Sequence, residues 1–216
     1  MSKNASDFKQ TLWNSANSLR GQMDPGEYKH IVLGLIFLKY ISDAFNNQKQ
    51  RIIESLTNPN SDFFISENLE DIDETIINDR DFYKKDSVFW VPENSRWEEI
   101  QSSAKQTDIG QRIDDALVSI ENENKFLKGK LDKRFGKQEL NPVKLGQLID
   151  KISEINFENN NSKDFLGEIY EYFIGKFAMQ EGKKGGQFYT PKHIVKTLVS
   201  IIKPLSGRIY DPCCGT

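Results

Sequence analysis

Residues 24–42 read DPGEYKHIVLGLIFLKYIS and contain both a helix start signal and a long apolar run. Asp24 is placed to cap a helix, Pro25 suits the first helical position, and Glu27 can complete a capping box. The apolar residues that follow cover most of the helix circumference: Tyr28, Ile31, Val32, Leu35, Ile36, Phe37, Leu38 and Ile41. A helix that is apolar on most sides is a buried one. The stretch therefore predicts a central helix.

Shorter helices are expected before and after the central helix. An apolar stripe at helical spacing precedes it and ends at Gly21; its members are Phe8, Leu12, Trp13, Ala16 and Leu19. Farther along, Ser95 and Glu98 form a second capping box, which predicts a helix with Trp97 in its first turn. Asp108 is placed to cap a helix whose apolar residues are Ile113, Leu117 and Ile120.

The last helix of this first part is expected to begin at Asn141-Pro142. Its inward residues are predicted to be Val143, Leu145, Leu148, Ile149 and Ile152. Residues 57–94 are less regular, and a short extended piece is expected at 87–91. The Asn-rich stretch 156–162 is the best candidate for a linker, so we expect a first domain that is almost entirely helical.

Composition limits the class of protein. The chain has 216 residues, of which 37% are hydrophobic and 28% charged, values typical of a folded globular protein. The longest apolar run, residues 31–38, is much shorter than the roughly 18 residues of a membrane span. No secretory signal is evident, and two adjacent cysteines offer no disulfide framework, so a cytoplasmic location is expected.

Charge is segregated along the chain, although the formal net charge is only −3. Residues 67–81 carry seven acidic side chains against the single base Arg80, and residues 125–137 carry six basic ones against Asp132. Both runs can be solvated faces. Alternatively, the basic run contacts DNA phosphates in an assembled complex, in which case neutralising Lys128, Lys130, Lys133 and Arg134 would flatten the salt dependence of binding.

Two more helices are expected after the linker. The first has Phe165, Leu166, Ile169, Tyr170, Phe173 and Phe177 at helical spacing, and the glycine-rich residues 181–186 end it. Thr190 can cap the second and Pro191 can begin it. Its buried side is predicted to consist of Ile194, Val195, Leu198, Val199 and Ile202, with Pro204 closing it.

Residues 208–210, Arg-Ile-Tyr, are expected to form one strand with Asp211 at its carboxyl end. Ligands bind open α/β sheets at that end of the strands. The predicted fold class is mainly α: an N-terminal helical domain at 1–160, followed at 161–216 by the first elements of a Rossmann-like α/β domain.

Two short motifs in this last part can carry chemistry. In DPCCGT, residues 211–216, Pro212 fixes a turn, the small Cys213 and Cys214 leave room for a ligand, and Gly215 lets backbone N–H groups approach it. A tight turn without a ligand would use the same residues. In GQFYTP, residues 186–191, the aromatic pair can equally pack the turn, and the threonine can be a plain helix cap.

These motifs, together with residues 12–42 and DFLGEIYEYFIGKFA at 164–178, resemble the modification subunit of type I restriction-modification systems. That subunit is an adenine-N6 DNA methyltransferase of the gamma arrangement. The resemblance implies S-adenosylmethionine as the methyl donor, DNA as the substrate, and the specificity and restriction subunits of the same system as partners.

The resemblance also implies a cofactor site with two walls. The first consists of Gln187, Phe188, Tyr189, Thr190, Pro191 and Lys192; the second begins with Asp211, Gly215 and Thr216. Their chemistry suits a ligand with a sulfonium, an adenine ring and a zwitterionic tail, which calls for aromatic faces, a helix N-terminus for the carboxylate and an acceptor for the ammonium.

The chain departs from the family in one respect. The Asn/Asp-Pro-Pro-Tyr/Phe loop that holds the target adenine is absent, and neither NPN at 58–60 nor NPV at 141–143 replaces it. No catalytic residue is therefore predicted, and we expect a truncated chain that is inactive alone. His30 and His193 lack metal-ligand spacing, so no metal site is expected. The rival hypothesis is a non-catalytic helical module that contacts a protein or DNA.

Overall fold

The structure is a computed structural model of the 216-residue chain. It describes residues 3–17, 25–137, 140–155, 157, 162–181, 192–203, 206–208 and 210. In this part of the chain every regular element is a helix, and no strand is present. No described helix is long and apolar enough to span a membrane. The predicted helical class is confirmed, whereas a Rossmann-like start is not.

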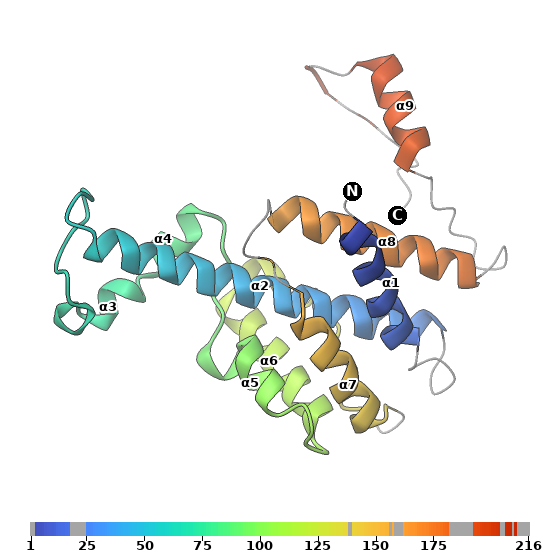
Figure 1. The fold of residues 1–216 in the computed structure, drawn as a ribbon, viewed down its shortest axis with the longest axis horizontal. Coiled ribbons are helices and arrows are strands. Elements are labelled where there is room, and N and C mark those ends of the chain that lie inside the picture. Colours follow the sequence, from blue (N-terminus) through green and yellow to red (C-terminus); the bar gives the residue numbers. More distant parts are fainter. Residues whose placement is uncertain are drawn as a thin grey trace.

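The central element is α2 (Pro25–Thr57), a helix of 33 residues that extends for about 50 Å at 1.5 Å per residue. Figure 1 shows α8 (Ser162–Glu181) along one side of α2, and α5 (Trp97–Ser102) and α7 (Pro142–Ser153) on the other. All apolar residues predicted for this helix are buried except Phe37, which is partly buried. The prediction of a central helix is therefore confirmed, although its proposed cap Asp24 lies outside the described residues.

The remaining helices of the first part pack on α2 or on its neighbours. α1 (Lys3–Asn17) contacts α7 and α8, and α6 (Ile109–Glu123) packs on α5 and α7. Two short helices, α3 (Glu74–Ile77) and α4 (Arg80–Lys85), lie against α2 toward its C-terminal end (Figure 1). Single 3₁₀ turns are present at η1 (Leu69–Asp71), η2 (Glu93–Ser95) and η3 (Lys125–Leu127).

Aromatic contacts join α8 to α1 and α2. The Trp13 ring lies 5.7 Å from that of Phe173 and 5.1 Å from that of Phe177, edge to face in both cases. Tyr28 makes a third edge-to-face contact with Phe177 at 5.0 Å. Within the predicted linker, Phe157 is also buried, with its ring 5.5 Å from that of Tyr40. α8 and Phe157 thus share the core of the preceding helices, and the division at residue 160 stays a prediction.

The capping box predicted at Ser95 is wrong, although the helix exists. α5 begins at Trp97 with Arg96 in the cap position, and the Ser95 hydroxyl makes no cap hydrogen bond. The cap comes instead from a distant residue, because the Trp97 backbone N–H donates to the Ser42 hydroxyl of α2 at 2.7 Å. Ser95 belongs to the preceding 3₁₀ turn and is buried. A tertiary contact has replaced the local one.

Two further predictions are wrong in detail: the cap at Asp108 and the burial of Val143. Asp108 does precede α6, but its carboxylate pairs with Arg112 at 3.0 Å instead of capping the helix. Asn141 caps α7 as predicted, accepting hydrogen bonds from the backbone N–H groups of Val143 and Lys144. Val143, however, is 68% exposed, because it lies in the first turn of α7 beyond the reach of the core. No strand forms at 87–91.

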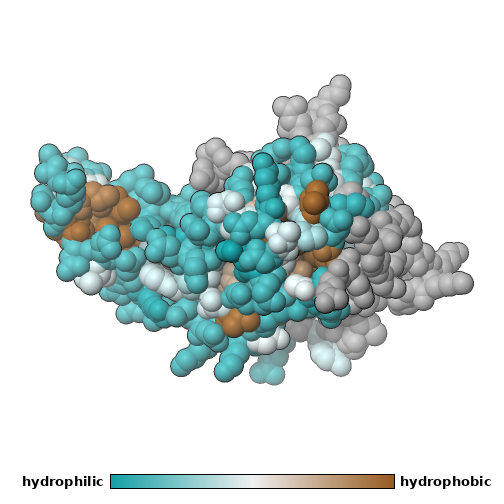
Figure 2. Space-filling model, turned by 90° about the horizontal axis from the view of Figure 1, so that it is seen from below, coloured by the Kyte–Doolittle hydropathy of each residue, from teal (hydrophilic) through white to brown (hydrophobic). Residues whose placement is uncertain are grey.

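At the end of the molecule that carries α3, apolar side chains meet solvent. Figure 2 shows them as a brown patch surrounded by hydrophilic surface, and its exposed members are Phe63, Phe64, Ile65 and Leu69. All seven acidic side chains of residues 67–81 are exposed. The acidic run is thus a solvated face, as one of the two readings of the sequence expected.

α9 (Lys192–Ile202) stands apart from the other helices in Figure 1. The residues predicted to be buried on it are exposed: Ile194, Val195, Leu198, Val199 and Ile202. That prediction is wrong for the described structure, in which these side chains are 43–70% exposed and α9 lies away from the other helices (Figure 1). Arg208 and Tyr210 are in coil, and Ile209, Pro191 and Pro204 lie outside the described residues, so the predicted strand is not observed.

Candidate functional site

The two walls predicted for a cofactor lie almost wholly outside the described residues. This holds for Gln187, Phe188, Tyr189, Thr190, Pro191, Asp211, Gly215 and Thr216. Lys192 is the first residue of α9, and only its backbone is described. Among the described residues, no group of His, Cys, Asp or Glu side chains could hold a metal ion. The cofactor site therefore stays a prediction.

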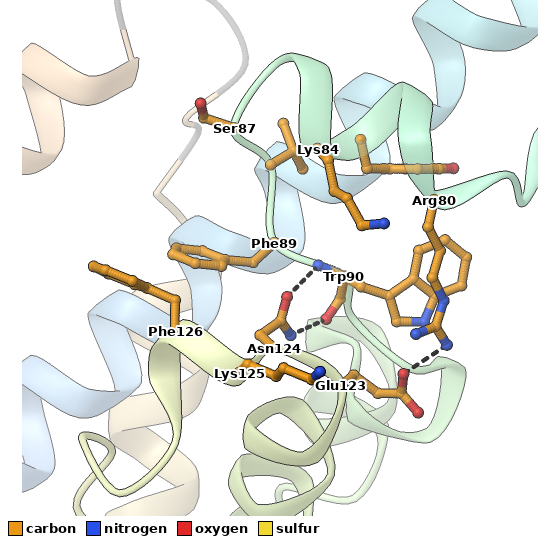
Figure 3. Close-up of a pocket in the computed structure, with 11 residues that line it drawn as sticks. Arg80, Lys84, Ser87, Phe89, Trp90, Glu123, Asn124, Lys125 and Phe126 are labelled. Carbon is orange, nitrogen blue, oxygen red and sulfur yellow. Dashed lines mark hydrogen bonds and ion pairs between the residues drawn. The ribbon is translucent and has the colours of Figure 1, made fainter.

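The described residues do form a cavity of about 650 Å³ at a different place. It lies between α4, the segment 87–90 and the junction of α6 with η3 (Figure 3). The lining residues are Arg80, Tyr83, Lys84, Ser87, Val88, Phe89, Trp90, Glu123, Asn124, Lys125 and Phe126. Its size is within the range of about 300–1,000 Å³ that is typical of small-molecule sites.

The turn after α4 directs the chain along one wall of this cavity. Ser87 adopts a positive φ of 57°, and its N–H donates to the Lys84 carbonyl at 3.0 Å. The Val88 N–H donates to the Tyr83 carbonyl at 2.9 Å. This pair of hydrogen bonds is the Schellman arrangement, which ends a helix with one left-handed residue. The chain then reverses and places Phe89 and Trp90 opposite α6.

Asn124 holds that wall in position. Its side-chain oxygen accepts from the Trp90 N–H at 2.9 Å, and its amide donates to the carbonyl oxygens of Trp90 at 2.8 Å and Ile120 at 2.7 Å. Because both the oxygen and the nitrogen of the Asn124 side-chain amide are hydrogen-bonded, the side chain has a defined orientation. The segment 87–90 is thereby tied to the end of α6 before any ligand binds.

An aromatic cluster forms the base of the cavity. The Tyr83 ring stacks on Phe45 of α2 at 4.8 Å, and Trp90 meets both rings edge to face at 5.1 and 5.2 Å. Burial raises the pKa of the Tyr83 phenol, with an opposing contribution from the Arg96 charge. The phenol stays neutral and donates to the Ile77 carbonyl at 3.1 Å. The base is therefore a packed apolar surface.

Charged side chains surround the opening. Arg80 pairs with Glu123 at 2.6 Å, and its guanidinium lies 5.0 Å from the centre of the Trp90 ring. Lys84 pairs with Asp81 at 3.0 Å, but both side chains are well exposed, so this pair is weak. Lys125 forms no ion pair within the described part of the chain. The lining thus has three cations and one carboxylate.

The basic run 125–137 continues from this opening and is anchored on α6. The carboxylate of Glu121 accepts from the Leu131 N–H at 2.8 Å and from the Lys133 ammonium at 2.7 Å. Asp114 accepts from the backbone N–H groups of Phe135 at 3.0 Å and Gly136 at 2.9 Å. Burial opposes ionisation of Glu121, yet the hydrogen bonds outweigh it, and its pKa is lowered.

The predicted exposure of this run is confirmed for its lysines, and Arg134 is partly buried. Lys128 and Lys130 are exposed, and the Lys130 ammonium lies 3.7 Å from the centre of the Phe126 ring. Lys133 is also exposed but pairs with Glu121, and Arg134 pairs with Asp132 at 2.6 Å. Two of the four cations predicted to act together are therefore held by carboxylates, which leaves Lys128 and Lys130 available to an external anion.

The cavity was missed in the sequence, although signals for it were present. Arg80 is the only base in the acidic run, Lys125 is the first residue of the basic run, and the apolar segment at 87–91 separates two polar stretches. Each signal is weak alone. Only the fold shows that these three parts of the chain meet.

Comparison with known proteins covers most of the chain. Residues 8–152 match the family model described as HsdM N-terminal domain, and residues 161–216 match the one described as N-6 DNA Methylase. The chain is 37% identical over 212 residues to the type I restriction enzyme MjaIX methylase subunit of Methanocaldococcus jannaschii, which is 97% of this chain and 38% of that protein.

Two further relatives agree with this match. The type I restriction enzyme HindI methylase subunit of Haemophilus influenzae is 35% identical over 147 residues, 58% of this chain and 33% of the relative. The MpnII methylase subunit of Mycoplasma pneumoniae is 27% identical over 234 aligned positions, 95% of this chain and 41% of the relative. The chain spans about two fifths of the length of the MjaIX and MpnII subunits.

A solved structure has the same fold. The type I restriction-modification system methyltransferase subunit of Streptococcus thermophilus superposes with a TM-score of 0.67 at 24% identity, over 91% of this chain and 43% of the other. With a family model matching at residues 8–152 and relatives of one kind, the chain belongs to the family of type I restriction enzyme methylase subunits.

Proposed function

We propose that this chain acts as part of a methylase subunit that transfers a methyl group from S-adenosylmethionine to N6 of adenine in DNA. The observation that carries the proposal is the match of residues 161–216 to the N-6 DNA Methylase family, because both candidate cofactor motifs lie within that range. We further propose that it works with the specificity and restriction subunits of a type I system, since the relatives are methylase subunits of such enzymes.

The residue types of the two motifs support the choice of cofactor. Thr190 offers a hydroxyl at the start of a helix, which suits the carboxylate of S-adenosylmethionine, and Asp211 suits its ammonium group. Phe188 and Tyr189 offer aromatic faces to the adenine ring and the sulfonium. α9 begins at Lys192, directly after these residues, so a helix does follow the first motif.

The target adenine needs a further element. A loop of the Asn/Asp-Pro-Pro-Tyr/Phe type would hold its amino group and stack on the base, and none of the 216 residues forms that motif. We therefore propose that methyl transfer requires additional sequence and that the 216-residue chain alone is inactive. In the assembled enzyme, the exposed Lys128 and Lys130 contribute contacts to DNA phosphates.

The test uses this chain and a longer protein that continues through a complete methyltransferase domain. Each is mixed with a specificity subunit, unmodified DNA and radiolabelled S-adenosylmethionine, and N6-methyladenine is measured after digestion. The longer protein is expected to methylate DNA and the short chain not to. Methylation by the 216-residue chain, or none by the longer protein with any donor, would contradict the proposal.

Variants of the longer protein test the assigned cofactor wall. Replacing Phe188 or Thr190 by alanine should weaken cofactor binding about tenfold in calorimetry, because each removes one contact to a charged or aromatic part of the ligand. Lys196→Gln is the matched control, since Lys196 is exposed on α9 and outside the motif. Equal affinity in all three variants would show that the motif does not contact the cofactor.

A further inference from the structure

The cavity beside α4 has no part in the function proposed above. It is lined by residues of the helical domain alone, and both candidate cofactor motifs are separate from it in sequence. Its walls are already ordered, because Asn124 ties the segment 87–90 to α6 and the aromatic cluster supports Trp90 from below. A preformed, partly apolar cavity is the usual form of a ligand site.

The charged side chains of the lining indicate the charge of a ligand that would fit this cavity. Of the three cationic side chains in the lining, Arg80 has the only lining carboxylate, Glu123, as its partner. Lys84 is held only by an exposed pair with Asp81, and Lys125 forms no ion pair with another described residue. Two ammonium groups are thus available beside the opening, and no second lining carboxylate competes for them. The ligand that complements this lining is an anion.

Aromatic surface decides the shape of the ligand. Phe126 is 73% exposed, an unusual position for so large an apolar ring, and Figure 3 shows it beside Phe89 on one side of the opening. Phe89 is supported from behind by Phe37 of α2, whose ring centre lies 6.4 Å away. Flat rings stack on such faces with little dependence on their substituents. The ligand is therefore expected to contain an aromatic ring.

From these features we infer that the cavity binds a nucleoside phosphate. The base lies against Phe126 and Phe89, and the phosphate lies between Lys84 and Lys125, with Arg80 on the side of the opening away from the two rings. The cavity of about 650 Å³ has room for one nucleotide. The same chemistry fits a free nucleotide or one unpaired nucleotide of a DNA strand. Binding is independent of methyl transfer, so its failure would leave the proposed function untouched.

The experiment titrates the chain with adenosine 5′-monophosphate and follows it by calorimetry and by the amide NMR signals of Trp90 and Asn124. Adenosine and inorganic phosphate are titrated separately. Each is expected to bind at least about tenfold more weakly than the nucleotide, because each lacks one half of the contacts. Short single-stranded oligothymidylate forms the last arm. Stronger binding than the mononucleotide identifies a strand as the source, and weaker binding identifies a free nucleotide; either supports the site.

Variants locate the binding. Lys125→Gln and Phe126→Ala should each weaken the nucleotide about tenfold, and neither residue is part of the core, so folding is not at risk. Lys105→Gln is the matched control, because it removes an exposed cation that does not line the cavity and has no proposed role in DNA contact. The inference is overturned by absence of nucleotide binding at millimolar concentration, or by affinity that neither Lys125→Gln nor Phe126→Ala changes.

Discussion

α8 and α9 both carry apolar residues at helical spacing, but their surroundings in the structure differ. Both form the predicted helix. α8 buries Ile169, Phe173 and Phe177 against α1 and α2. α9 leaves Leu198 and its apolar neighbours about half exposed. Apolar spacing therefore predicts which face of a helix is apolar, whereas burial of that face also needs a second surface that packs on it.

The largest expected effect comes from removing one apolar side chain on each helix. Phe173→Ala should lower the free energy of unfolding by about 3–5 kcal/mol, because the ring is fully buried between α1, α2 and α8. Leu198→Ala on α9 should change it by less than about 0.5 kcal/mol, since the side chain is 52% exposed. Urea denaturation followed by circular dichroism measures both.

Equal losses of unfolding free energy in the two variants would contradict the contrast between α8 and α9, because α9 would then have a packing partner in solution. A partner for α9 would also give a more specific result. If Leu198→Ala lowered stability in a longer protein but not in this chain, the added sequence would be the surface that covers α9.

Two glycines also differ in their surroundings: Gly110 is closely packed, and Gly167 faces open space. A Cβ on Gly110, at the start of α6, would lie 2.0 Å from the Phe135 carbonyl oxygen, so the backbone of residues 135–136 would have to move. Gly110→Ala should therefore cost about 1–3 kcal/mol. Gly167→Ala in α8 meets nothing within 4 Å and should raise stability by about 0.5–1 kcal/mol through helix propensity. Thermal denaturation distinguishes the two, and similar changes of either sign would contradict the close approach.

Much of the helical part could be predicted because its signals are local. The apolar circumference of α2, the Asn141 cap and the helical spacing of α8 each depend on residues within one element. The predicted cap at Ser95 is wrong because the hydrogen bond that replaces it, from the Trp97 N–H to the Ser42 hydroxyl, joins residues 55 positions apart. The predicted burial of Val143 is wrong because its exposure depends on where α7 meets the core.

The candidate sites divide in the same way. The two cofactor motifs were found because each is a contiguous run, and they remain untested by the described residues. The cavity was not found because Arg80, Trp90 and Lys125 come from three separate segments, and no spacing rule brings them together. Contacts among distant residues follow from the packing of whole helices, which local pattern does not contain.

The last prediction concerns the basic run, residues 125–137, which Glu121 holds against α6. The Glu121 side chain is 9% exposed, and its carboxylate accepts hydrogen bonds from the Lys133 ammonium and the Leu131 backbone N–H. Glu121→Gln should lower the free energy of unfolding by about 1 kcal/mol at neutral pH, because the amide keeps the shape but loses the charge. Glu54→Gln is the control, since Glu54 is exposed on α2.

The pH dependence of this effect has a definite sign. The folded-state pKa of Glu121 is lowered, so the contribution is fully present above the ordinary glutamate pKa of 4.5 and is lost as the pH falls through the lower folded value. The stability difference between the unmodified chain and Glu121→Gln should therefore shrink as the pH is lowered from 7 toward and below 4.5, in urea titrations at each pH. A difference that stays constant over that range would contradict this prediction, because the contribution of Glu121 would then not depend on its charge.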